Sequence, residues 1–208
     1  FERMDTRVGP MSIEVVQPLQ SVRIKLDDAE GISADLTFEG RHFPVEEPRF
    51  TRRNGSRMMM DVTRMTQNGR WSGSITVDGE TIEISSDNFW GTRDRSWGVR
   101  PLGAQDPQPV VPQQLPQFYW IWTPMNFPNA SVYFHVNEDQ QGDRWNTRSV
   151  FAMDGAGADG LTHLANPVIK PEFEAGTRRV RSAVLTASDA HGREHRIIYE
   201  PIATFQMK

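Results

Sequence analysis

Two short motifs match spacings that carry known chemistry. His191–His195 fits H-x-x-E-H, with which a helix presents two histidines to zinc and places a glutamate beside them as base. Gly155–Gly160 fits the G-x-G-x-x-G of a dinucleotide site, which needs a helix opening at the third glycine. Gly192 stands inside the first motif and Pro167 interrupts the segment after the second. We therefore predict a surface turn and a glycine loop, with neither a metal nor a cofactor.

A denser collection of reactive side chains lies in Asn88–Pro101, which reads NFWGTRDRSWGVRP. If this stretch alternates as a strand, Trp90, Thr92, Asp94 and Ser96 share one face, and Arg93, Arg95 and Trp97 share the other. Charged side chains then lie beside aromatic ones, where an unpaired buried charge is costly. The simplest expectation is structural: Asp94 holds an arginine or backbone amides at a buried corner, and Arg93, Arg95 and Arg100 belong to the same motif.

A second group lies on two later strand-like segments. Alternation places Phe118, Trp120 and Trp122 on one face of the first segment, and the second carries Tyr133 and His135. This set could line an apolar pocket with a few polar groups, or it could be ordinary core. His135 is the histidine with strand-like apolar residues on both sides, so it is a candidate acid or base as well as a candidate hydrogen-bonded core residue.

The elements that must position these residues show a period of two nearly throughout. The candidate strands are 21–26, 31–38, 57–66, 70–77, 80–86, 117–123, 130–136, 145–153, 178–187 and 193–199. Asn68-Gly69 and Asp78-Gly79 favour type I′ turns and predict a three-stranded meander, and Asp189–Gly192 predicts a later hairpin. Sustained helical periodicity is absent from the sequence, so we expect an all-β, antiparallel, lipocalin-like barrel or sandwich.

A stretch rich in proline and glutamine, residues 101–116, divides the sequence. Proline removes a ladder donor and fixes φ, so this stretch is expected to be a connection. It predicts one β-domain over residues 1–100 and a second over residues 117–208. Because the chain opens at Phe1 without a start-like segment, we expect both domains to be incomplete parts of a longer polypeptide.

Composition narrows the function classes. The chain has 208 residues, a formal net charge of -4 and 24% charged residues. Its net charge therefore provides no electrostatic attraction to nucleic acid. It has no cysteine, which removes disulfides and thiolate chemistry and fits a reducing, cytoplasmic compartment. No apolar run approaches the ~20 residues of a membrane span. We expect a soluble protein whose oligomeric state the sequence does not specify.

Several stretches together resemble a known family. They are Asp5–Pro10, Glu14–Pro18, Asp35–Gly40, Glu46–Phe50, Gln67–Gly73, Asp78–Glu80 and above all Trp90–Arg100. In this order they resemble a bacterial family similar to carotenoid 1,2-hydratase (hydroxyneurosporene synthase) and to lipocalin-like pericyclases. The resemblance covers roughly Asp5 to Asn137 and is most specific at the Arg-Asp-Arg-Ser-Trp-Gly core. It implies two tandem lipocalin-like β-domains and an apolar polyene, terpenoid or steroid as ligand.

The resemblance also implies a chemical hypothesis, a hydratase, isomerase or cyclase without a cofactor. Such a reaction needs a protonated acid beside π faces that stabilise a carbocation. Asp94 is the first candidate acid and His135 the second, and the candidate ligand-binding residues are Trp90, Trp97, Trp120, Trp122 and Tyr133. Against Asp94 stand its cationic neighbours, which lower a carboxyl pKa.

Two other classes of function stay open. A non-catalytic carrier would use the same cavity, and an interaction module would pair its exposed sheet edges with another chain. An enzyme should lose turnover but keep ligand affinity in Asp94→Asn or His135→Gln, whereas a carrier has no turnover to lose.

Overall fold

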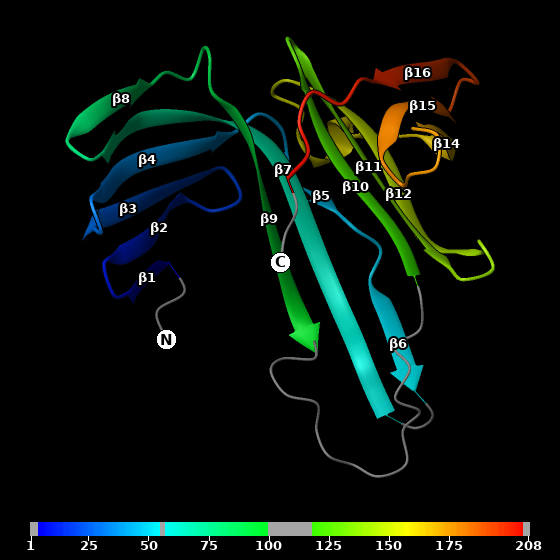
Figure 1. Ribbon diagram of the computed structural model, residues 1–208, viewed down its shortest axis with the longest axis horizontal. Helices are drawn as coiled ribbons and strands as arrows, with labels where there is room; N and C mark the ends of the chain where they lie inside the picture. Colours follow the sequence, from blue (N-terminus) through cyan, green and yellow to red (C-terminus); the bar gives the residue numbers. More distant parts are fainter. Residues whose placement is uncertain (1–3, 55–56, 100–117, 206–208) are drawn as a thin grey trace.

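The chain folds into three antiparallel sheets, seen in a computed structural model that describes residues 4–54, 57–99 and 118–205 (Figure 1). Sheet A has nine strands, sheet B four and sheet C three. Among the described residues the helical structure is one short 3-10 turn, Ala158–Gly160. Sheet A curls into a half-barrel. The predicted all-β, antiparallel, barrel-like fold class is confirmed.

Sheet A is organised around one long strand, β7 (Arg57–Val77). One edge of β7 pairs with β4 (Ile32–Gly40), β5 (Val45–Glu46) and β6 (Phe50–Asn54), and the other with β8 (Glu80–Ile84) and β9 (Trp90–Val99). The sheet continues from β4 through β3 (Ser21–Ala29) and β2 (Met11–Gln17) to β1 (Asp5–Val8). The half-barrel is the part built by β1–β4, β8 and the second half of β7 (Figure 1).

Sheet B lies between sheets A and C (Figure 1). It contains β10 (Phe118–Phe127), β11 (Ala130–Asp139), β12 (Arg144–Met153) and β13 (Thr162–His163). Sheet C contains β14 (Ala165–Phe173), β15 (Val180–Ser188) and β16 (Glu194–Tyr199). The alternation of β11 divides the core: Tyr133 packs with Val45 of sheet A, and Phe134 packs with Leu185 of sheet C.

The predicted meander is wrong at its first turn. Asn68 and Gly69 lie inside β7, paired with Thr92 and Gly91 of β9. A Cβ on Gly69 would stand 2.1 Å from Cζ of Phe38, so this glycine allows close packing across the sheet instead of a turn. The second turn is confirmed: Asp78 and Gly79 have φ of 48° and 84° and connect β7 to β8.

The other predicted strands have counterparts in the structure. Each segment from β10 to β12 and the final hairpin of β15 and β16 overlaps its prediction. β14 was not predicted, because Pro167 and Pro171 lie within it and each removes a ladder donor. Its pairing with β15 shifts register beside the first of these prolines.

The sheets separate at the stretch predicted to be a connection. Sheet A uses residues between Asp5 and Val99, and sheets B and C use residues between Phe118 and Tyr199. The connection itself, residues 101–116, lies outside the described residues, so the domain division stays a prediction. None of the described residues forms a helix long and apolar enough to cross a membrane.

Candidate functional site

The two predicted acid–base residues, Asp94 and His135, lie at opposite ends of one polar network between sheets A and B. Arg64 of β7 lies at the centre of the part that sheet A contributes: its Nε is 3.6 Å from Asp94 and its Nη1 is 3.8 Å from Glu47. The hydroxyl of Tyr133 donates to Glu47 at 2.5 Å and lies 3.1 Å from Nδ1 of His135. Five side chains from β9, β7, the segment after β5 and β11 thus form a continuous chain of polar contacts.

Asp94 is the exposed end of this network. Its side chain is 48% exposed, so the expectation of a buried corner is wrong, although the arginine partner is present in Arg64. The register sets this arrangement: Asp94 is opposite Thr66 and Ser96 is opposite Arg64, so all four residues share one face. The predicted division of β9 into two faces agrees with this pairing.

Glu47 is the buried carboxyl group of the network. It follows β5 directly, and its backbone N–H donates to the carbonyl of Arg64 at 2.8 Å. Burial raises the pKa of Glu47, while the hydrogen bond from Tyr133 and the charge of Arg64 oppose this shift. Burial and the carboxyl of Glu47 in turn hold the pKa of Tyr133 far above its ordinary value.

His135 is the buried end of the network. Its pKa is lowered to about 4, chiefly by burial and also by the charges of Arg64 and Arg148, while a hydrogen bond with the side chain of Asn146 opposes the shift. The imidazole is therefore neutral at pH 7, and the Nδ1–H tautomer would donate to the Tyr133 hydroxyl. This is the environment of a hydrogen-bonded core histidine.

The predicted aromatic ligand-binding residues separate into three places. Trp122 lies beside the network, where its indole N–H donates to Thr66 at 3.3 Å, and Trp120 stacks 5.2 Å from the guanidinium of Arg64. Trp90 stacks against two other guanidiniums, those of Arg41 and Arg70. Trp97 lies on the opposite face of β9 from Asp94 and is 49% exposed. The structure therefore gathers Trp120, Trp122, Tyr133 and His135, and leaves Trp90 and Trp97 outside.

The arginines of the motif also separate. Arg93 donates to Gln67 at 2.8 Å and stacks 5.4 Å from the ring of Phe38, which agrees with a structural role. Arg95 is exposed on the same face. Arg100 lies outside the described residues.

The two motifs with chemical spacing do not sit on helices. His191 is in the hairpin turn that Asp189 caps, with backbone N–H donors of His191 and Arg193 at 2.9 and 3.0 Å. Burial alone would raise the pKa of Asp189, but hydrogen bonds from Arg193, His191 and His195 outweigh it and lower this pKa. Gly155–Gly160 forms the loop that ends in the 3-10 turn. Among residues 4–54, 57–99 and 118–205, no group of three or more His, Asp or Glu side chains is placed to hold a metal ion.

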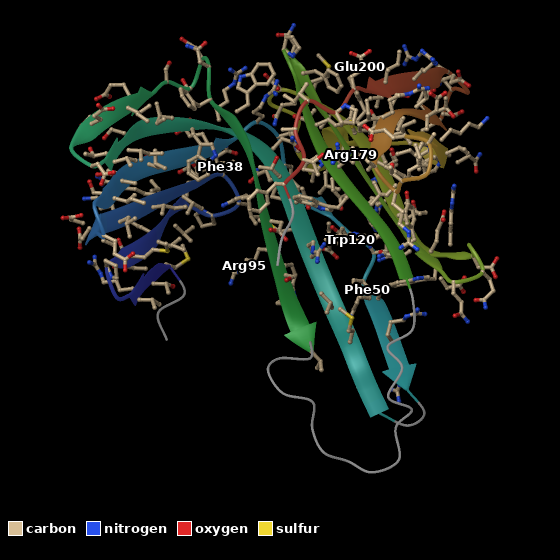
Figure 2. The ribbon with its side chains drawn as sticks, viewed as in Figure 1. Phe38, Phe50, Arg95, Trp120, Arg179 and Glu200 are labelled. Carbon is tan, nitrogen blue, oxygen red and sulfur yellow. The ribbon has the colours of Figure 1, made fainter. Side chains whose placement is uncertain are left out.

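A different feature stands out on the half-barrel: one face of sheet A is apolar across six strands. Cross-strand pairing aligns three apolar rows: Val8, Met11, Leu26, Ala34, Ile75 and Ile82; Ile13, Ile24, Leu36 and Ile84; and Val15, Val22, Phe38 and Trp71. We call these three rows the apolar face. Figure 2 shows Phe38 and Arg95 on the concave side of the curled sheet, which is the side of this face.

The apolar face is open over much of its extent. Val8 is 70% exposed, Ile82 is 50% exposed, and Met11 and Ile13 are also exposed. The opposite face of the same strands is polar, with Arg23 and Asp35 in a two-bond ion pair and Ser72, Ser74 and Glu83 lining a shallow depression. An antiparallel sheet with this division normally packs its apolar face against a second layer. No second layer of described residues covers Val8, Met11, Ile13 or Ile82.

The apolar face and the polar network are on opposite sides of sheet A. Arg64 and Thr66 of β7 point toward sheet B, whereas Met65 and Gln67, one residue on, belong to the side of the apolar face. A molecule on the apolar face would therefore meet Arg93, Arg95 and Trp97 of β9, and it would be separated from Asp94 and His135 by the sheet itself.

Sequence reasoning missed the centre of the polar network and the apolar face. Glu47 and Arg64 have no motif around them, and their meeting depends on the pairing of β5 with β7. The apolar face could have been predicted from the sequence. In β3, apolar Val22, Ile24 and Leu26 alternate with polar residues, Ser21, Arg23 and Lys25, and this alternation already separates the two sides of the strand.

Comparison with known proteins adds one relationship. The whole chain, residues 1–208, matches the family model described as "Family of unknown function (DUF8625)". No curated protein and no solved structure matches the chain.

Proposed function

The chain belongs to the DUF8625 family, whose function is unknown, and we propose that it binds an apolar small molecule on the apolar face of the half-barrel. The observation that supports this most strongly is the combination of curvature and exposure: three aligned apolar rows on the concave side, with Val8, Met11, Ile13 and Ile82 in contact with water. Contiguous exposed apolar surface of this kind marks a ligand or partner site.

Transfer free energies give the binding free energy that the exposed side chains of the apolar face could contribute. Covering one half-exposed isoleucine or valine contributes roughly 1 kcal/mol, at about 25 cal/mol per Å² of apolar surface. Four such residues contribute roughly 4 kcal/mol, so tight binding also requires the ligand to cover the partly exposed rows behind them. A polyene, terpenoid or steroid skeleton, as the resemblance to the hydratase-like family implies, has the extended apolar surface that such rows require.

Binding without a chemical step fits the geometry better than catalysis does. The candidate acids Asp94 and Glu47 and the histidine His135 are across sheet A from the apolar face. The side chains on the ligand's side of β9 are two arginines and a tryptophan, which have no acid to offer. We therefore place the carrier ahead of the hydratase, isomerase or cyclase, in the cytoplasm that the lack of cysteine favours.

The test begins with organic extraction of the purified protein and mass spectrometry of what is released. It continues with a fluorescence titration using N-phenyl-1-naphthylamine, an uncharged apolar probe. Ile82→Gln should weaken probe binding about fivefold, because it removes apolar contact worth roughly 1 kcal/mol. The matched control is Ile198→Gln: Ile198 is 56% exposed on sheet C, so this variant should bind as the unmodified protein does.

Three results would overturn this proposal. If nothing is extracted and the probe does not bind, the apolar face is a protein interface. If Ile198→Gln weakens binding as much as Ile82→Gln does, the probe is on sheet C. If a bound terpenoid is chemically changed, and Glu47→Gln or Asp94→Asn stops the change while affinity is kept, the protein is an enzyme.

A further inference from the structure

We propose that the ligand of the apolar face carries a carboxylate, and that Arg95 binds this head group with Arg93 behind it. This inference rests on the proposed function and specifies its ligand class as an amphipathic anion, a long apolar chain or ring system that ends in one carboxylate. Its source is a pair of like charges at the margin of an otherwise apolar surface.

Arg93 and Arg95 are two residues apart on β9 and therefore project from the same side of the sheet. Across the strand boundary they face Gln67 and Met65, which continue the side of β7 that carries Trp71. Arg93 reaches the apolar face directly, with its guanidinium 5.4 Å from the ring of Phe38. A head group at Arg95 would thus leave the rest of the ligand lying toward Phe38 and the three rows.

The two guanidiniums have no carboxylate partner among the described residues. Arg93 donates to the neutral Gln67, and its Nη2 is buried without a hydrogen-bond partner there. No described carboxylate lies within 4 Å of Arg95, whereas Arg7, Arg23 and Arg64 of sheet A each have one. On the same side of the sheet, the carboxyl nearest to Arg95 by register is Glu46, two strands away opposite Met65, and it forms no ion pair with another described residue. An anion at this position would relieve the repulsion of two adjacent cations.

Burial and electrostatics favour the same occupant. Burial lowers the pKa of Arg93, and the neighbouring charge of Arg95 lowers it further, which is the signature of a cation kept without compensation. A guanidinium binds a carboxylate through two parallel N–H donors, the strongest neutral-pH interaction that an exposed arginine offers. Arg95 is exposed, so its guanidinium can bind a carboxylate in this way. The less accessible Arg93 adds positive electrostatic potential behind Arg95.

The test compares two probes with the same C16 chain, hexadecanoate and hexadecan-1-ol, as competitors of N-phenyl-1-naphthylamine at pH 8 and below micellar concentrations. The carboxylate should bind about tenfold more tightly than the alcohol. Arg95→Met should remove this preference and leave the affinity for the alcohol unchanged, since Met keeps the apolar stem. Arg196→Met, at an exposed arginine of β16 in sheet C, should change neither.

The outcomes separate this inference from the proposed function. If alcohol and carboxylate bind equally and Arg95→Met changes neither, the carboxylate is wrong and the apolar site stands. If neither competitor nor the fluorescent probe binds, the apolar site itself is wrong. If Arg95→Met weakens alcohol and carboxylate equally, Arg95 acts by packing and its charge has no part in recognition.

Discussion

At the scale of single residues, the polar network between sheets A and B combines groups that titrate in opposite directions. His135 is a base whose pKa is lowered by burial, and Glu47 is an acid whose pKa is raised by burial. Both shifts favour the neutral form, and the charge of Arg64 lies between Glu47 and the more exposed Asp94. The arrangement is that of a buried structural contact whose stability depends on pH.

His135 supplies a pH prediction. Its pKa is about 4 in the folded chain against 6.5 ordinarily, so the unfolded state binds the proton more tightly. Above pH 6.5 the imidazole is neutral in both states and does not reduce stability. As the pH falls from 6.5 toward 4, the free energy of unfolding decreases by about 3 kcal/mol, because the unfolded state takes up the proton first. Glu47 acts in the opposite sense, since a raised carboxyl pKa favours folding as pH falls. Urea unfolding at pH 7 and pH 4 should show a smaller loss in His135→Gln than in the unmodified protein.

The control for this measurement is His191→Gln, at the exposed histidine of the β15–β16 turn. It should lose as much stability between the two pH values as the unmodified chain does. An equal loss in His135→Gln would mean that the imidazole is not held neutral in the folded protein.

At the scale of elements, β7 contains two glycines, Gly69 and Gly73, that are required for different physical reasons. Gly69 is required by packing, because a Cβ there would meet Phe38 and the carbonyl oxygen of Glu39 at 2.1 and 2.6 Å. Gly73 is required by backbone conformation, with φ of +124° and a Cβ position 2.0 Å from the carbonyl oxygen of Asp35. Asn68-Gly69 therefore resembles a turn in sequence and serves as a close contact in the sheet.

Gly69→Ala should lower the free energy of unfolding by about 1–3 kcal/mol, since Phe38 is buried and cannot move aside without strain. Gly157→Ala is the matched control, because a Cβ there meets nothing within 4 Å and the backbone needs no positive φ. Urea denaturation of both variants measures the difference. A turn at Asn68-Gly69 would instead leave Gly69→Ala with the modest cost of a strained φ and an undisturbed Phe38.

The same element explains what could be predicted from the sequence. Alternation is a local signal, so the strands around Val22 and Trp122 and the final hairpin were predicted correctly. Continuation of a strand through Asn68-Gly69 depends on Phe38, thirty residues earlier, which no local pattern records. The contact of Glu47 with Tyr133 spans 86 residues and was invisible for the same reason.

At the scale of the whole molecule, one arginine joins sheet A to sheet B. Arg41 follows β4, and its side chain is buried among acceptors from sheet B and the loop after it. They are Asp154 at 2.8 Å, Asn126 at 3.1 Å, and the carbonyl oxygens of Phe127 and Pro128 at 2.7 and 3.2 Å. The ring of Trp90 lies 5.3 Å from its guanidinium carbon, which gives this tryptophan of the motif a structural role.

Arg41→Ala should lower the free energy of unfolding by about 3–5 kcal/mol, because it leaves a carboxylate and several acceptors without their donor. Arg70→Ala is the control: Arg70 donates to Ser86 at 3.0 Å and lies 3.9 Å from Asp154, so its loss should cost about 1 kcal/mol or less. Calorimetry of both variants measures the two costs. Equal melting temperatures would mean that Arg41 does not hold the sheets together.

The length of β7 has a mechanical consequence for the two halves of the molecule. At about 3.3 Å per residue, the 21 residues of β7 extend over roughly 70 Å measured along the strand. One half of this strand belongs to the half-barrel, and the other half contacts sheet B, where Arg64 stacks on Trp120 and Thr66 accepts a hydrogen bond from Trp122. A strand bonded along both edges resists bending, and Gly73 keeps both of its neighbours, Leu36 of β4 and Ile84 of β8, in regular register. A force on the half-barrel would therefore pass along β7 to the half of the strand that contacts sheet B.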